Sequence, residues 1–170
     1  MKKIVSHILK AIKNKESILI FSDYDADGIT GNAILNNFFK KINYNNFHSF
    51  IPNRNIDGYG FTEKLATKIC NGKIFDDKKF IPDLVITIDC GITNFKSSEI
   101  LAKNKIDLII TDHHIANGKI PKAIGILNHK VKDEKYPEQI LSGAGIVFKL
   151  VQALIIEIKK TNEKIDIIEG

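Results

Sequence analysis

Three aspartates at alternate positions, Asp23, Asp25 and Asp27, are the residues of this sequence best suited to chemistry. They follow the apolar run 18–21 and come just before Gly28. Carboxylates crowded in this way repel one another unless a cation lies among them, and oxygen ligands suit magnesium and manganese. The pattern therefore predicts a divalent metal site. The alternative is an acidic turn, or a capping cluster for the next helix.

Two later apolar runs also end in side chains that can bind metal. One ends at Asp89, and the next ends in the tripeptide Asp112-His113-His114. Adjacent histidines project in different directions, so one can bind a metal while the other faces substrate or solvent. Asp112 can orient one of these histidines through a hydrogen bond. Three run ends of this kind favour a catalytic centre over chance surface residues.

An alternation of strands and helices is needed to bring these residues together. Strands are expected at 18–21, 47–51, 84–88, 106–111 and 123–127, and helices at 3–14, 30–42, 62–69, 96–105 and through 148–155. This order predicts an α/β fold, a doubly wound and mostly parallel sheet flanked by helices in three α/β/α layers. The carboxyl ends of neighbouring parallel strands meet at one edge, and side chains at every second position of an extended segment point to one side. A two-metal hydrolytic centre at that edge is then expected from Asp23, Asp25, Asp27, Asp89 and His113.

Substrate-binding groups are expected on two loops. Arg54 is the only arginine of the chain and lies in the turn-rich segment 52–60. A planar guanidinium suits phosphate recognition, although chance and an ordinary strand-to-helix connection are alternatives. Gly143 and Gly145 lead into the last helix and indicate a close backbone approach, either to another element or to a phosphate.

Composition is typical of one intracellular domain. The chain has 170 residues, of which 44% are hydrophobic, and this is enough for one substantial core. A net charge of +5 permits a polyanionic partner without requiring one. Cys70 and Cys90 are expected as free thiols in a reducing cytoplasm, with a single disulfide as the alternative. No secretory signal or segment of transmembrane length is recognisable, so a cytoplasmic protein without membrane contact is expected.

Five ordered motifs resemble the catalytic domain of the DHH phosphoesterase superfamily. They occupy residues 22–28, 52–60, 88–92, 111–114 and 142–150. The aspartate triplet and the Asp-His-His tripeptide indicate the superfamily alone. The segments 52–60 and 142–150 favour the RecJ-type single-strand-specific DNA exonucleases within it.

The resemblance implies a manganese- or magnesium-dependent enzyme that removes nucleotides from the 5′ end of single-stranded DNA, in repair or recombination. By position, the implied metal ligands are Asp25, Asp27, Asp89 and His113, with Asp23 joining them. Asp112 matches the supporting acid, His114 a group that faces the scissile phosphate, and Arg54 a phosphate contact. Gly143 and Gly145 are expected to approach the substrate.

The sequence also departs from the family pattern. Family members carry a further metal-binding aspartate and then a second domain that grips the strand. Neither is recognisable here, because Asp133 is the last aspartate before Asp166 in the charged tail. Residues 1–170 are therefore expected to be one DHH catalytic domain, a fragment whose missing parts could come from a partner chain. Two other functions stay open: a DHH phosphatase or oligoribonuclease acting on short nucleotides, and a non-catalytic nucleic-acid-binding scaffold. The intact acidic set argues against the scaffold.

Overall fold

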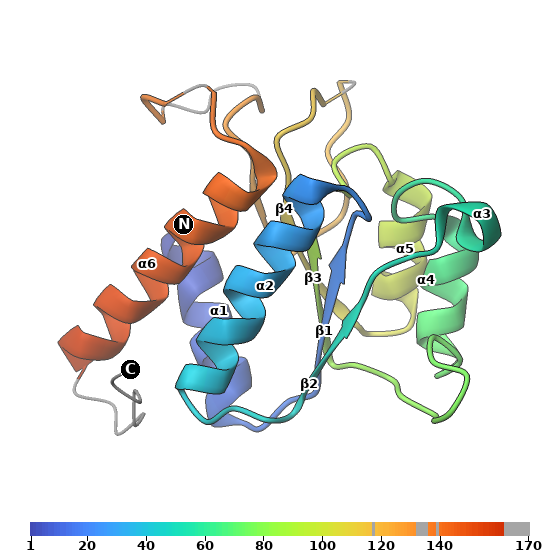
Figure 1. Cartoon of the computed structure of the whole chain (residues 1–170), viewed down its shortest axis with the longest axis horizontal. Coiled ribbons are helices and arrows are strands. Elements are labelled where there is room, and N and C mark those ends of the chain that lie inside the picture. The colour runs from blue at the N-terminus through green and yellow to red at the C-terminus, as the bar shows by residue number, and fades with distance from the viewer. Residues whose placement is uncertain (117, 132–135, 139, 162–170) are drawn as a thin grey trace.

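A computed structural model describes residues 1–116, 118–131, 136–138 and 140–161 (Figure 1). The strands are β1 (Ile18–Ser22), β2 (Phe47–Phe50), β3 (Leu84–Ile88), β4 (Asp107–Thr111) and β5 (Gly125–Leu127). The helices are α1 (Lys2–Lys13), α2 (Ala26–Lys41), α3 (Arg54–Asp57), α4 (Glu63–Cys70), α5 (Phe95–Lys103) and α6 (Gly143–Thr161). Asp133 and Asp166, on which the expected lack of a further acidic motif depends, lie outside the described residues.

The five strands form one parallel sheet in the order β2-β1-β3-β4-β5. The predicted α/β class and the parallel sheet are thereby confirmed. The chain order reverses between β1 and β3, and crevices at such reversals are where open α/β sheets bind ligands. The three central strands also end level with one another, because Ser22 pairs with Ile88 and Ile88 pairs with Thr111.

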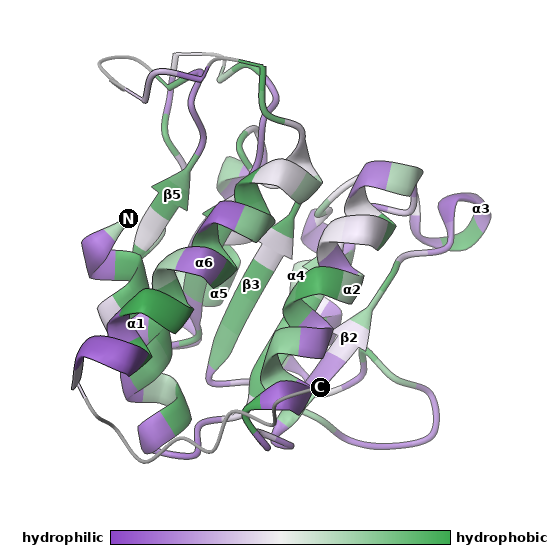
Figure 2. Ribbon diagram, turned by 60° about the vertical axis from the view of Figure 1, so that its left-hand side comes forward, coloured by the Kyte–Doolittle hydropathy of each residue, from purple (hydrophilic) through white to green (hydrophobic). Residues whose placement is uncertain are grey.

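Helices cover both faces of the sheet, as the three-layer prediction expects (Figure 1). Ile18 and Ile20 of β1 face a core shared with α1, α2 and α6, whereas Leu19 and Phe21 face a second core shared with α4 and α5. This alternation is the side-chain period of a strand buried on both sides. Figure 2 shows β3 coloured as hydrophobic along most of its length, whereas the helices around it carry both hydrophilic and hydrophobic residues.

Helix α2 begins four residues earlier than the apolar pattern indicates. Asp25 caps it by accepting hydrogen bonds from the amides of Asp27 and Gly28, at 3.0 and 2.9 Å. Gly28 is required there, because a Cβ atom would lie 2.4 Å from the backbone oxygen of Asp23. The expectation that the aspartate triplet stays extended is therefore wrong after Asp25, and Asp27 lies in the first helical turn.

Two expectations from composition can be compared with the described residues. Cys70 and Cys90 are both free thiols, as predicted. Among the helices of the described ranges, none combines the length and the apolar content that a membrane crossing needs.

Candidate metal centre

Backbone hydrogen bonds fix three aspartates at the carboxyl edge of the sheet. The amide of Asp23 donates to the Ile88 carbonyl at 3.0 Å, and the amide of Asp89 donates to the Thr111 carbonyl at 2.8 Å. The amide of Asp112 continues the series to the next strand, at 3.0 Å from the Leu127 carbonyl. Each aspartate is the first residue after its strand, so the three side chains start from one level of the sheet. The sequence thus places each aspartate at the end of a strand, and the parallel sheet brings the three strand ends side by side.

Asp23, Asp25 and Asp89 form the first group. One carboxylate oxygen of each lies within 4.8 Å of the others. Asp23 is buried, and its Oδ1 atom accepts a hydrogen bond from the Tyr24 amide at 2.8 Å. Burial, and the charge of Asp25 to a smaller extent, raise the pKa of Asp23 despite that hydrogen bond. Asp25 is exposed. Its side chain both caps α2 and belongs to this acidic group.

Asp89 is the most perturbed side chain of the site. It is 1% exposed, and its backbone takes a positive φ of 60°, which non-glycine residues seldom adopt. Burial and the charges of Asp27 and Asp25 raise its pKa to about 8. The Oδ1 atom lies 3.1 Å from His113 Nε2, yet the contact lacks hydrogen-bond geometry and leaves this oxygen unpaired within the described part of the chain. A buried carboxylate oxygen without a donor is a position that a cation would satisfy.

His113 and His114 complete a second group with Asp89. One ligand atom of each of the three lies within 4.8 Å of the others. Burial and the neighbouring His114 lower the pKa of His113, which favours the neutral imidazole that metals bind. His114 Nδ1 lies 2.7 Å from Asp112 Oδ1. A carboxylate accepts only, so Nδ1 is the donor, and the neutral form of this imidazole has its lone pair on Nε2, where a ligand can bind.

Protein donors surround the Asp112 carboxylate. Its Oδ1 atom accepts from the amides of His113 and His114 at 2.7 and 3.0 Å, and its Oδ2 atom accepts from the Ile92 amide at 2.9 Å. With the imidazole of His114 included, four donors surround a side chain that is 1% exposed. Asp112 is therefore placed to orient the two histidines and not to ligate a cation itself.

Asp27 differs from the other aspartates because the last helix binds it. The amides of Gly143 and Ala144, at the N-terminus of α6, donate to its two carboxylate oxygens at 2.6 and 2.9 Å. Burial alone would raise the pKa of Asp27, but these amides, the Ser142 side chain and nearby His113 outweigh it and lower the pKa. Asp27 Oδ2 lies 3.8 Å from His113 Nε2, and Asp27 belongs to neither group of candidate ligands found among the described residues.

The glycine-rich start of α6 approaches another element closely. A Cβ atom on Gly143 would lie 2.5 Å from Asp89 Oδ1 and 2.8 Å from Asp89 Cβ, so no side chain fits there. On Gly145 the nearest atom would be Leu141 Cδ2 at 3.3 Å. Of the two alternatives for this segment, contact with another protein element is what the structure shows at Gly143. Whether either glycine also contacts substrate stays a prediction.

Arg54 begins the short helix α3 and is exposed at the rim of the site. Its guanidinium carbon lies 5.6 Å from the centre of the Tyr24 ring, which packs edge-on against Tyr59 at 6.2 Å. Burial and the charges of Asp23 and Asp89 raise the pKa of Tyr59, which places its hydroxyl group in the field of the acidic cluster. A cation and two aromatic rings therefore border the carboxylates on the β1 side.

The chemistry of the donor set fits hard divalent cations. Carboxylate oxygens dominate, imidazole nitrogens supplement them, and Asp89 belongs to both groups. Magnesium and manganese prefer such ligands, and a cation between the groups would relieve the mutual repulsion that raises the Asp89 pKa. The arrangement is thus able to hold metal and to present it at an open edge of the sheet.

Comparison with known proteins identifies the family. The model for the N-terminal domain of the DHH family matches residues 17–169. The chain belongs to the DHH family. The single-stranded-DNA-specific exonuclease RecJ of Bacillus subtilis (strain 168) is 33% identical over 158 residues, which are 93% of this chain and 19% of that protein. RecJ of Thermus thermophilus is 34% identical over 145 residues, which are 85% of this chain and 20% of that protein.

Solved structures agree with this assignment. A crystal structure of exonuclease RecJ bound to manganese matches 91% of this chain and 37% of its own, with a TM-score of 0.77 and 29% identity. The predicted resemblance to RecJ-type members of the DHH family is confirmed. The chain spans about a fifth of the length of the two curated relatives.

The DHH site gathers most of the predicted residues and adds others. Four of the five predicted metal ligands lie in the two groups, whereas Asp27 lies beside them. His114, predicted to face substrate, joins the second group. Sequence reasoning did not single out Asn128, whose amide donates to the His114 carbonyl at 2.8 Å and holds the Asp-His-His loop against β5. The sequence signal that could have identified Asn128 is its position, as a polar residue directly after a predicted strand.

Proposed function

We propose that this chain is the catalytic domain of a RecJ-type exonuclease that hydrolyses single-stranded DNA from its 5′ end. One observation carries the proposal: the buried Asp89 oxygen, unpaired among the described residues and shared by two groups of ligand side chains, at the sheet edge of a domain that matches manganese-bound RecJ. Similarity of fold alone would not support a shared activity, because one fold can carry many functions. A buried acidic cluster with one unpaired carboxylate oxygen among the described residues supports metal-dependent chemistry.

Each side chain has a distinct part in that proposal. Asp23, Asp25, Asp89, His113 and His114 would hold manganese or magnesium, and Asp112 would fix the orientation of His114. Bound divalent cations supply Lewis-acid polarisation of a phosphodiester and make water a stronger nucleophile at neutral pH.

The groups around the cluster would position the DNA. Arg54, whose guanidinium carbon lies 5.6 Å from the centre of the Tyr24 ring, would offer two parallel N–H groups to a phosphate at the rim. Backbone at Gly143 and Gly145 would border the same strand, although the amides at the start of α6 already hold Asp27.

The biological setting forms part of the same proposal. Single-stranded DNA is the proposed partner, in DNA repair and recombination, and free Cys70 and Cys90 suit the reducing cytoplasm. Residues 1–170 are proposed to be one DHH catalytic domain that works with a fourth acidic motif and a strand-gripping domain lying elsewhere. This proposal agrees with the comparison, because the chain matches only 19% and 20% of the length of the two curated relatives.

The test is release of nucleotides from a 5′-phosphorylated single-stranded oligonucleotide with Mn²⁺ present. Asp89→Asn is the informative variant, because asparagine tolerates the positive φ at this position and loses only the charge. Asp76→Asn, on an exposed loop, is the matched control. We expect wild type and control to release nucleotides from the 5′ end and Asp89→Asn to lose the activity.

Other results would lead to different conclusions. Faster release from dinucleotides than from long strands would favour an oligoribonuclease or phosphatase. A folded chain that binds Mn²⁺ but releases nothing, even with the remaining part of a RecJ protein added in trans, would refute the nuclease proposal and favour a scaffold.

A further inference from the structure

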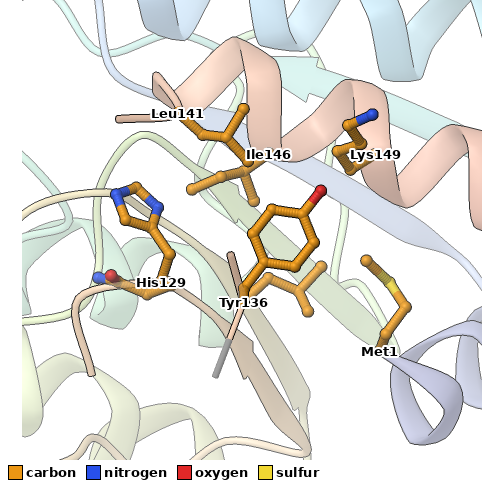
Figure 3. A pocket seen from close by; sticks show the side chains of 8 residues that line it. Met1, His129, Tyr136, Leu141, Ile146 and Lys149 are labelled. Atoms are coloured by element: carbon orange, nitrogen blue, oxygen red, sulfur yellow. The ribbon is translucent and has the colours of Figure 1, made fainter. Parts of the chain in front are cut away.

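A pocket lies on the same edge of the sheet, beyond the metal ligands. It has a volume of about 110 Å³ and opens between the end of β5, the start of α1 and the first turns of α6. Figure 3 shows the imidazole of His129 on one side of this pocket, Met1 on the other, and the Tyr136 ring between them. Its lining residues are Met1, Leu127, Asn128, His129, Tyr136, Leu141, Ile146 and Lys149.

His129 is the unusual member of the lining. Its side chain is 6% exposed, and neither Nδ1 nor Nε2 has a hydrogen-bond partner among the residues that the structure describes. Buried polar atoms are almost always paired, because desolvation without a partner is costly. A neutral imidazole carries one donor and one acceptor, and both nitrogens are closed to solvent, so a ligand in the pocket must displace part of the lining to pair with them.

The walls favour an aromatic ligand over water alone. Leu127, Leu141 and Ile146 are apolar, and a water needs two to four polar partners to be held firmly. The hollow, at about 110 Å³, is smaller than the apolar cavities of about 150 Å³ that accept benzene, so it holds the edge of one ring while the rest of the ring extends through the opening. Lys149 lines the pocket and is half-buried. Its ammonium group would attract the phosphate backbone of a strand whose base occupies the pocket.

Two residues connect the pocket with the metal centre. Ile146 comes three residues after Gly143, which contacts Asp89, so a single turn of α6 joins the two sites over about 5 Å. On the opposite side, Asn128 lines the pocket and holds the carbonyl of His114. A ligand in the pocket and a phosphate at the metal ligands would therefore be neighbours.

We propose that this pocket receives one nucleobase of the single-stranded substrate, with His129 hydrogen-bonding the polar edge of the base and Leu141 and Ile146 contacting its faces. This inference rests on the proposed function, which it deepens by adding a base-binding subsite. Such a subsite would hold the strand in place beside the phosphodiester that is cleaved.

Nuclear magnetic resonance of the metal-free chain tests the subsite directly. The chain has five histidines, and the His129→Gln variant identifies which imidazole signals belong to His129. The probes are deoxythymidine, deoxyadenosine and a short oligothymidylate, in the presence of EDTA. We expect saturable shifts of the His129 signals, with His7 and His48 unmoved as internal controls.

Variants then test whether the imidazole itself recognises the base. Because phenylalanine keeps an aromatic ring but has neither a donor nor an acceptor for the base edge, His129→Phe should lower nucleoside affinity by a factor of about five. The Ile146 amide reports binding in the variants, and His129→Gln replaces His129→Phe if the larger ring prevents folding.

The outcomes separate this inference from the proposed function. Nucleosides contain no phosphodiester, so these titrations are independent of nuclease activity. If neither the nucleosides nor the oligonucleotide shifts the His129 signals, or inorganic phosphate shifts them equally, the base subsite is refuted while manganese-dependent nuclease activity can still stand. If His129 responds as expected but the chain releases no nucleotides, the subsite stands and the nuclease proposal fails.

Discussion

Replacing Gly143 by alanine should damage the metal centre without removing any ligand. The added Cβ atom would lie 2.5 Å from Asp89 Oδ1 and 2.8 Å from Asp89 Cγ, whereas ordinary contacts begin near 3.4 Å. Either Asp89 or the first turn of α6 must therefore withdraw by roughly 1 Å. Withdrawal of α6 would also stretch the two amide hydrogen bonds that hold Asp27.

That displacement is large on the scale of a functional site. Ligands need to be held within about 0.5 Å, and a misplacement of about 1 Å can cost a factor of about 100 in activity. Overpacking costs about 1 to 3 kcal/mol, and alanine regains up to about 1 kcal/mol of helix propensity. For Gly143→Ala we expect a Mn²⁺ affinity lowered at least about tenfold, with a smaller loss of unfolding free energy.

Gly145→Ala is the matched control two residues further along the same helix. Its Cβ atom would meet the flexible end of Leu141 at 3.3 Å, so the helix should gain about 0.5 to 1 kcal/mol and keep its Mn²⁺ affinity. Isothermal titration with Mn²⁺ and urea unfolding measure the two quantities. Equal Mn²⁺ affinity in both variants would refute the claim that the missing side chain of Gly143 leaves space that Asp89 needs.

Three further predictions concern charge and packing. Mn²⁺ should raise the thermal midpoint of wild type by several degrees and that of Asp89→Asn far less, because bound metal stabilises the folded state; calorimetry with and without EDTA measures this. Gly28→Ala should lower the unfolding free energy by about 1 to 3 kcal/mol in urea titrations, since its Cβ meets the backbone of Asp23. Burial and the charge of Glu16 raise the pKa of Tyr44 to about 12 from 10.0, so folding favours the neutral phenol. The stability that Tyr44 adds over Tyr44→Phe is therefore complete below about pH 10 and should fall by about 2 to 3 kcal/mol toward about pH 12, as paired urea titrations across that range can measure.

The centre of the sheet was predictable because β1 and β3 are mostly apolar runs. Two-sided burial requires that pattern, and β1 and β3 begin and end within a residue of the expected bounds. The start of α2 was less predictable, since it depends on capping as well as on periodicity. Asp25 caps α2 through its side chain, so the helix starts inside the acidic triplet and not after it.

The candidate site was predictable in its members but not in their division of labour. Residue type and position after a strand identify Asp23, Asp89 and the two histidines as neighbours once a parallel sheet is assumed. Which carboxylates remain free depends on contacts between elements far apart in sequence. Asp27 is held by α6, 116 residues further along the chain, and no local pattern contains that information.

A physical reason connects the burial of Asp89 with the structure around it. The fold places this carboxylate at a positive φ, removes water from it and surrounds it with three other aspartates, and each of these is unfavourable for the metal-free chain. The same features strengthen the attraction for a divalent cation, because Coulomb interactions grow as the local dielectric falls. Stability and metal binding are therefore opposed at Asp89, and α6 limits the conflict by holding the Asp27 carboxylate with two amides. Two pairs of unfolding curves test that opposition: without metal Asp89→Asn should be more stable than wild type, and with Mn²⁺ it should be less stable.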